Sequence, residues 1–133
     1  KFKSTANIIN WDISKEIPIE LKNKQFDIIN AIGIIFHIVD DTLWKKAIKN
    51  LASLLGDRGV LIIGGDFGST TQERGVMRKT RSLQAWRLVA QEFELKILDI
   101  KRYDWWGGAD EGGLTNNLLI LGKAESSFQA ISI

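Results

Sequence analysis

The sequence predicts an α/β fold in which a mostly parallel sheet carries helices on both of its faces. From residue 26 onward, short apolar runs typical of buried strands alternate with segments of helical periodicity, an order that produces such a sheet. The last two expected strands are joined by a Gly-rich loop without a helix, which predicts a C-terminal antiparallel hairpin. A length of 133 residues, 44% of them hydrophobic, suits one globular domain.

Two apolar, β-branched runs open the chain and predict buried strands at residues 6–11 and 26–33. Asp12 follows the first of them directly. In residues 43–55, apolar side chains recur at spacings of three and four, which predicts a helix capped by one of the residues 40–42. Gly56 is expected to end this helix in the left-handed conformation, before a third buried strand at residues 60–63.

The second half begins with a polar segment, residues 67–81, which contains four basic residues and one acidic residue. We expect a mobile loop there, either solvated or able to bind an anionic group such as a phosphate or carboxylate through Arg74, Arg78, Lys79 and Arg81. Ser82 can cap a helix with an apolar side that ends near Phe93, and strands are expected at residues 95–103 and 117–121.

Composition excludes several function classes. The 18 basic and 16 acidic residues give a net charge of +2 without clustering, which argues against nucleic-acid binding. The chain has no cysteine and one histidine, so thiolate catalysis and zinc sites are excluded and we expect no metal. No apolar run is long enough to cross a membrane, and no signal-peptide pattern follows Lys1, so we expect a cytoplasmic protein.

The segment from Asp12 to Phe67 resembles the central part of class I S-adenosylmethionine-dependent methyltransferases. It contains FDIINAIGIIFHIVDD at residues 26–41 and LWKKAIKNLASLLGDRGVLIIGGDF at residues 43–67. In that family an acid follows the third strand, and the fourth strand opens with Phe-Asp. A His-containing segment comes next. It is followed by a helix that ends in a sequence similar to LLKPGG and by a fifth strand similar to LLI. The sequence departs from the family at Asp57 and Arg58, where the family has Pro and Gly.

The resemblance implies a Rossmann-like fold of which residues 1–133 form a partial domain, from the third strand to the last. The family's Gly-rich loop after the first strand, and the acid after the second, have no counterpart in this sequence. We therefore expect the missing N-terminal strands to come from an upstream segment or from a second chain. Unpaired backbone groups at the gap would otherwise cost roughly 1–3 kcal/mol each if buried.

The implied activity is methyl transfer from S-adenosylmethionine to a small-molecule or sugar-like acceptor. An alternative is a non-catalytic methyltransferase-like fragment or subunit that binds a partner chain through an open sheet edge. A nicotinamide-dependent oxidoreductase of similar architecture has less support, because its fingerprint Gly loop is also missing.

The resemblance also implies site residues. The Asp12 carboxylate and the N–H of Ile13 would bind adenine, whereas the simplest alternative is that Asp12 only caps the following turn. Ala31, Ile32 and Gly33 would allow close approach of the cofactor, unless Gly33 is merely a turn residue.

His37, the only imidazole, is the candidate catalytic base, and its alternative is a structural role. Asp66 is expected to line the acceptor pocket or cap a loop, Trp44 and Trp86 to lie in the core, and Trp105 with Trp106 to cover the pocket or an interface.

Overall fold

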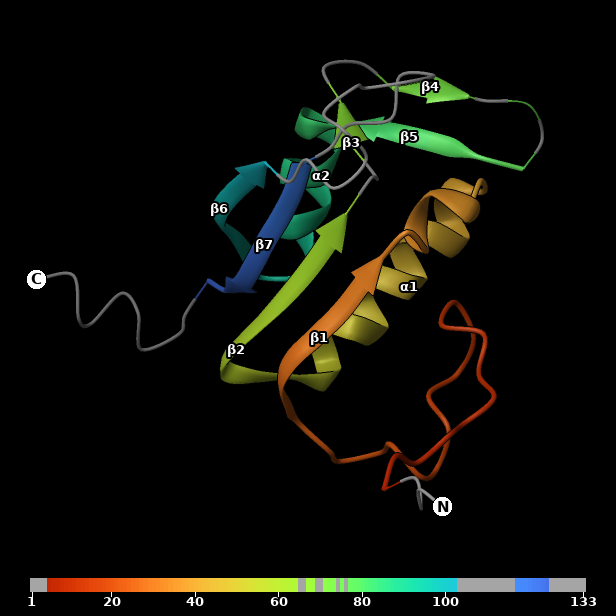
Figure 1. Ribbon diagram of the computed structural model, residues 1–133, viewed down its shortest axis with the longest axis vertical. Coiled ribbons are helices and arrows are strands. Elements are labelled where there is room, and N and C mark those ends of the chain that lie inside the picture. The colour runs from red at the N-terminus through yellow and green to blue at the C-terminus, as the bar shows by residue number, and fades with distance from the viewer. Residues whose placement is uncertain are drawn as a thin grey trace, which may run out of the picture.

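Four strands form the main sheet of the computed structural model, in the order β1-β2-β7-β6 (Figure 1). They are β1 (Phe26–Ile32), β2 (Leu55–Gly64), β6 (Leu95–Arg102) and β7 (Asn117–Lys123). The structure describes residues 5–64, 67–68, 71–73, 75, 77–102 and 117–124. Asp66, Arg74 and the Trp105–Trp106 pair lie outside these residues.

The pairing directions correct the expectation of a mostly parallel sheet. β1 and β2 are parallel, but β7 is antiparallel to both β2 and β6. The predicted C-terminal antiparallel hairpin is confirmed. Because β7 lies between β6 and β2, one strand introduces two antiparallel pairings into a sheet of four.

Both long helices lie on the same face of this sheet, so the expectation of helices on both faces is wrong for the described residues. Trp44 of α1 (Asp41–Leu54) meets Trp86 of α2 (Leu83–Glu92) edge to face, with ring centroids 5.1 Å apart. The two helices and the inner face of the sheet share one apolar core, and both helices lie behind the strands in Figure 1. The predicted core positions of the two tryptophans are confirmed.

The helix ends follow from local chemistry. The Asp40 carboxylate accepts from the N–H of Leu43 at 2.9 Å, and the Ser82 hydroxyl accepts from the N–H of Ala85 at 3.1 Å. The expected left-handed Gly56 is wrong, because the chain turns extended already at Leu55, with φ −84° and ψ 129°, and continues into β2. A Cβ at Gly59 would lie 2.6 Å from the Phe26 carbonyl oxygen, so close packing against β1 requires this glycine.

β1 is the expected second strand, but only one of its faces is buried. Ile29 and Ala31 pack toward the core, whereas the side chain of Ile28 is 65% exposed and that of Ile32 is 39% exposed. No strand in the described part of the chain pairs with the outer edge of β1. An apolar strand with an open face and an open edge results, which soluble proteins rarely leave uncovered.

The expected first strand, residues 6–11, does not form a strand in the structure. Ile8 is 92% exposed. The sequence has strand propensity, but a strand exists only when its backbone groups pair with a neighbour, and no described segment offers one.

A second, small sheet replaces the loop that the polar segment predicts. β5 (Lys79–Ser82) lies between β3 (Phe67–Gly68) and β4 (Gln72–Glu73). A short 3-10 helix, η1 (Ile35–His37), connects β1 to α1 and contacts β5. Among the described helices, none has the length and apolar character needed to cross a membrane.

Candidate functional site

The carboxyl end of β1 holds three of the predicted site residues. Ala31 is buried beneath this end, and Gly33 adopts a φ of +74° with open space where a side chain would stand. The Gly33 N–H donates to the Gly64 carbonyl at 3.1 Å, which ties the turn to β2. Ile32 points its N–H away from β2, toward the Asn30 side-chain oxygen at 3.0 Å. The turn therefore presents exposed backbone next to a residue without a side chain.

His37 lies four residues beyond this turn, at the end of η1. Its ring packs against that of Phe36 with centroids 4.3 Å apart, and its Nδ1 lies 3.4 Å from the Met77 carbonyl oxygen. A carbonyl can only accept a hydrogen bond, so this contact requires the proton on Nδ1. In the neutral ring, Nε2 then carries the lone pair and can accept a proton from a substrate.

Exposed apolar side chains border this region. Ile32, Ile34 and Met77 all expose more than a third of their surface. Ile32 and Ile34 flank Gly33 in the chain, and the Met77 carbonyl oxygen is the atom that contacts His37 Nδ1. In the described part of the chain, exposed apolar side chains thus lie near the imidazole of His37.

Two basic residues of the polar segment, Lys79 and Arg81, are engaged within the protein. Lys79 Nζ and Arg81 Nη2 each donate to Asp41 Oδ1 at 2.9 Å. The hydrogen bond from Lys79, together with that from Arg81, holds the pKa of the Asp41 carboxyl below its ordinary value. Two of the four cations expected to bind an anion therefore neutralise an internal carboxylate instead.

Asp12 and Ile13 lie elsewhere. The Asp12 carboxylate accepts from the Ser14 hydroxyl at 2.7 Å and from the Ser14 N–H at 3.0 Å, and these bonds lower the pKa of its carboxyl. Capping of the following turn by Asp12 is thus confirmed. The Asn50 side chain donates to the carbonyls of Ile13 and Lys15 at 2.8 and 2.7 Å.

These contacts place the Asp12 turn beside the last part of α1. Asn50 lies nine residues after the start of the helix at Asp41, or about 14 Å along its axis. Gly33 and His37 precede that start, so the structure does not bring Asp12 and Ile13 together with Ala31, Ile32 and Gly33. The sequence carried no signal for the Asn50 contacts, because an asparagine on the polar side of a helix is ordinarily solvated.

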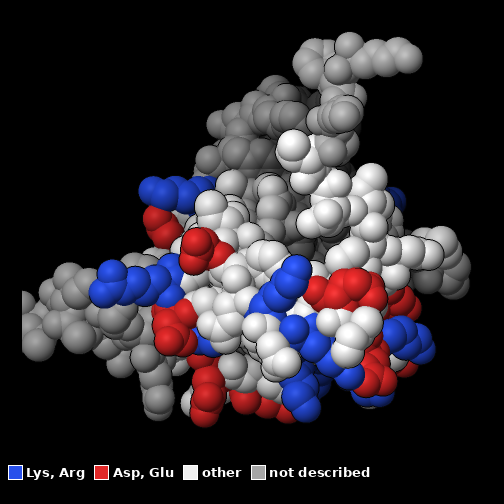
Figure 2. Space-filling view, turned by 90° about the horizontal axis from the view of Figure 1, so that it is seen from below, with Lys and Arg blue, Asp and Glu red and all other residues white. Residues whose placement is uncertain are grey.

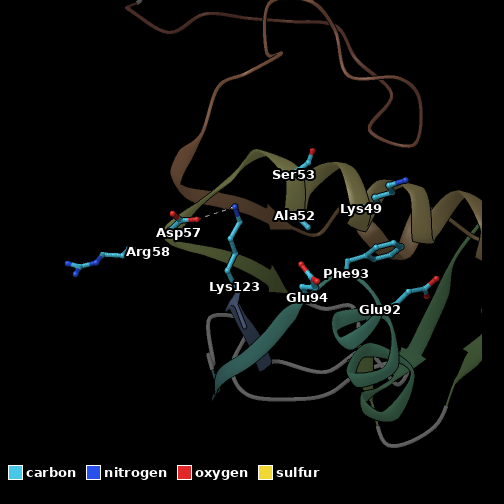
Figure 3. A pocket seen from close by; sticks show the side chains of 9 residues that line it. All are labelled: Lys49, Ala52, Ser53, Asp57, Arg58, Glu92, Phe93, Glu94 and Lys123. Atoms are coloured by element: carbon cyan, nitrogen blue, oxygen red, sulfur yellow. Dashed lines mark ion pairs between the residues drawn. The ribbon is translucent and has the colours of Figure 1, made fainter. Parts of the chain in front are cut away.

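A groove lies at the opposite end of the sheet, where β2 and β6 begin (Figure 3). It measures about 820 Å³ and lies between the ends of α1 and α2. Lys123 and Asp57 form an ion pair of 3.6 Å at its rim, and Phe93 contributes an aromatic wall. Figure 2, a view of this end, shows acidic and basic side chains interspersed without a dominant sign.

None of the predicted site residues lines this groove. In open α/β sheets, ligands bind outside the carboxyl ends of the strands, so its position argues against a cofactor site. The described residues also contain no cluster of His, Asp and Glu able to hold a metal ion.

No protein-family model and no curated protein matches the sequence. Solved structures do match the fold. An O-methyltransferase from a trans-AT polyketide synthase multienzyme of Brevibacillus brevis, in complex with S-adenosyl-L-homocysteine, has a TM-score of 0.69 at 19% identity, over 96% of this chain and 53% of that one.

Two further structures show how varied the similar proteins are. An O-methyltransferase from neocarzinostatin biosynthesis, in complex with S-adenosyl-L-homocysteine and 1,4-dihydroxy-2-naphthoic acid, has a TM-score of 0.59 at 12% identity, over 85% of this chain and 32% of that one. A pericyclic reaction enzyme has a TM-score of 0.60 at 12% identity, over 85% of this chain and 29% of that one.

This chain spans from about a third to about half the length of these three proteins. At such identities the likeness concerns the fold, and one fold can carry several reactions. The chain therefore has the fold found in S-adenosylmethionine-dependent methyltransferases.

Proposed function

We propose that this chain is part of an S-adenosylmethionine-dependent methyltransferase that acts on a small-molecule acceptor. The observation that carries the proposal is the fold likeness over nearly the whole chain to an O-methyltransferase. The open turn at the carboxyl end of β1 supports it, since this is where open α/β sheets bind their ligands.

The cofactor would lie against the turn formed by Ala31, Ile32 and Gly33. S-adenosylmethionine supplies an activated methyl group, so the protein needs chiefly to align donor and acceptor and to exclude water. Gly33 leaves the space that a side chain would fill, and its backbone can approach a ligand closely.

The adenine contacts proposed for Asp12 and Ile13 have a structural requirement. Residues 5–15 must leave their place beside Asn50 and pair at the sheet, where the end of such a strand meets the end of β1. The open edge of β1 lets another strand pair there. We propose that an upstream segment or a second chain supplies the strands that lie between.

His37 is proposed as the base that removes the acceptor's proton. Its Nε2 carries the lone pair when Nδ1 donates to the Met77 carbonyl. The exposed apolar side chains of Ile32, Ile34 and Met77 favour an acceptor with an apolar body and a hydroxyl that can reach the imidazole.

The alternative is a non-catalytic subunit that binds a partner chain. The open edge and open apolar face of β1 favour it, because both suit strand addition by another protein. In that case Gly33 and His37 have no ligand to contact.

Calorimetry on the full gene product with S-adenosyl-L-homocysteine tests the choice. We expect binding, and we expect Gly33→Val to weaken it at least tenfold, because the new side chain fills the space proposed for the cofactor. Gly75→Val is the matched control, since Gly75 has a φ of +67° and equally open surroundings. Absence of binding would favour the alternative, and an equal loss in both variants would contradict the placement of the cofactor at Gly33.

A second assay addresses His37. With a hydroxyl-bearing aromatic acceptor, His37→Gln should lower kcat at least 100-fold and leave the affinity for S-adenosyl-L-homocysteine unchanged. Unchanged turnover would assign His37 a structural role.

A further inference from the structure

We propose that Arg81 is a positioning residue for His37, holding the imidazole with its proton on Nδ1 and its lone pair on Nε2. The inference rests on the proposed role of His37 as the base. It concerns a group of contacts between β5 and the start of α1, here called the β5 clamp and defined as Lys79, Arg81 and Asp41 with the carbonyl of Val39.

Arg81 is the centre of the clamp. Its side chain is only 2% exposed, and its Nε and Nη2 donate to Asp41 Oδ1 at 3.2 and 2.9 Å. Nη2 also donates to the Val39 carbonyl at 3.1 Å, and the guanidinium carbon lies 4.3 Å above the ring of Trp44. A planar guanidinium can make these contacts at once, whereas a lysine offers a single charged nitrogen.

The clamp restrains both partners of the imidazole contact. Val39 and Asp41 follow His37 by two and four residues, and Lys79 and Arg81 follow Met77 by two and four residues. The clamp thus joins the two segments within two to four residues of the point where Nδ1 faces the Met77 carbonyl. Because each segment is short and anchored, the carbonyl stays directed at the ring.

The clamp therefore decides which ring nitrogen carries the proton. With the Met77 carbonyl in place, the tautomer protonated on Nδ1 gains a hydrogen bond that the other tautomer cannot make. Without the clamp, the imidazole is solvated and loses this bias. The result bears directly on catalysis, because only a deprotonated Nε2 on the open side can accept a proton from an acceptor.

Nitrogen-15 NMR of the histidine ring tests the inference without any reaction. His37 is the only histidine of this sequence, and loss of its signal in His37→Gln identifies it in the untagged full gene product. We expect the neutral ring to be protonated on Nδ1. In Arg81→Met, which keeps an apolar side chain over Trp44, the ratio of the two tautomers should shift by about fivefold toward Nε2 protonation, as for one lost hydrogen bond.

Two further variants complete the design. Lys45→Met is the matched control, since Lys45 lies on α1 like Asp41 and its 3.4 Å ion pair is with Glu92 of α2, outside the clamp, so the ratio should stay unchanged. Arg81→Lys should give an intermediate ratio, and it replaces Arg81→Met if that variant does not fold. A wild-type ring protonated on Nε2, or equal ratios in wild type and the Arg81 variants, would overturn the inference.

The outcome is separable from the proposed function. The tautomer measurement needs neither cofactor nor acceptor, so a protein that shows the shift but does not bind S-adenosyl-L-homocysteine contradicts the proposed function alone. If both hold, Arg81→Met should lower kcat by up to about fivefold, as the fraction of the reactive tautomer falls, without changing the affinity for S-adenosyl-L-homocysteine. Loss of that affinity in parallel would indicate a general structural role and would also overturn the inference.

Discussion

Asp41 shows how one side chain connects distant parts of the chain. It begins α1, and its carboxylate accepts from Lys79 and Arg81, which are 38 and 40 residues away. A carboxylate in the first turn also interacts favourably with the helix dipole. The clamp, the helix start and the small sheet therefore share a single charged group.

This arrangement predicts a pH dependence of stability. Because its pKa is lower in the folded protein than its ordinary value of 3.8, Asp41 contributes stability above that value, and this contribution is lost as the pH falls through the folded pKa. Asp41→Asn should lower the free energy of unfolding at pH 7 by about 1 kcal/mol or less, since the carboxylate is largely exposed. The difference from wild type should shrink as the pH falls below 3.8 and vanish once the pH is below the folded pKa.

Urea unfolding at several pH values measures this difference. Asp57→Asn is a suitable control, because its 3.6 Å ion pair with Lys123 is remote from the clamp and the Asp57 side chain is 86% exposed. A difference between Asp41→Asn and wild type that stays constant with pH would contradict the assignment.

Local chemistry made part of the site predictable at this scale. Asp40 and Ser82 act within three residues of themselves, so their capping roles follow from the sequence. The Asp41 clamp and the Met77 contact with His37 span about 40 residues, and nothing in the local pattern indicates them. The four basic residues of the polar segment therefore suggested an anion site, although two of them, Lys79 and Arg81, form ion pairs with Asp41.

Among the elements, β1 and residues 6–11 make an instructive pair. Both are short apolar runs rich in isoleucine, yet only β1 has a neighbour to pair with. The predicted helices and the later strands are confirmed. The helices have clear local periodicity, and the later strands find their pairing partners within the described part of the chain. The sequence predicted that both faces of β1 are buried, but one face is exposed. An apolar sequence indicates that a strand tends to be buried, but it does not show which element covers each face.

The two faces of β1 predict opposite effects from neighbouring substitutions. In the 133-residue chain, Ile28→Lys should reduce self-association at little cost in stability, because Ile28 stands on the open face. Ile29→Lys, one residue later, should destabilise by more than about 2 kcal/mol, because Ile29 packs against the core. Light scattering and urea unfolding measure the two effects, and equal destabilisation would show that the open face is covered.

At the scale of the whole molecule, the order of the strands in the sheet differs from their order in the sequence, because β7 lies between β2 and β6. β2 pairs on both sides, with β1 and β7, whereas β1 and β6 are edge strands in the described sheet. The α/β class and the final hairpin were predictable from alternation. The placement of β7 between β2 and β6 depends on contacts between residues far apart in the sequence, so local periodicity does not predict it. The family resemblance did indicate a terminal antiparallel pair.

Hydrogen exchange should reflect this order. We expect the slowest exchange in the paired region of β2 and β7. Within β1, alternate amides should differ. Gly33 donates to β2, so by strand geometry Ile29 and Ala31 also donate inward, while Ile28 and Asn30 face the open edge and should exchange much faster. Uniform protection along β1 would reveal a further strand on that edge.

The central place of the last strand also has a consequence for biosynthesis. During translation the amino-terminal elements emerge first, but β2 and β6 become neighbours of a common strand only after Asn117–Lys123 has been made. Until then, β2 lacks a partner along one edge, and β6 has no described strand paired along either edge. Nascent chains that stall before this point therefore expose these unpaired edges, and addition of the seven-residue strand β7 joins β2 and β6 in one sheet.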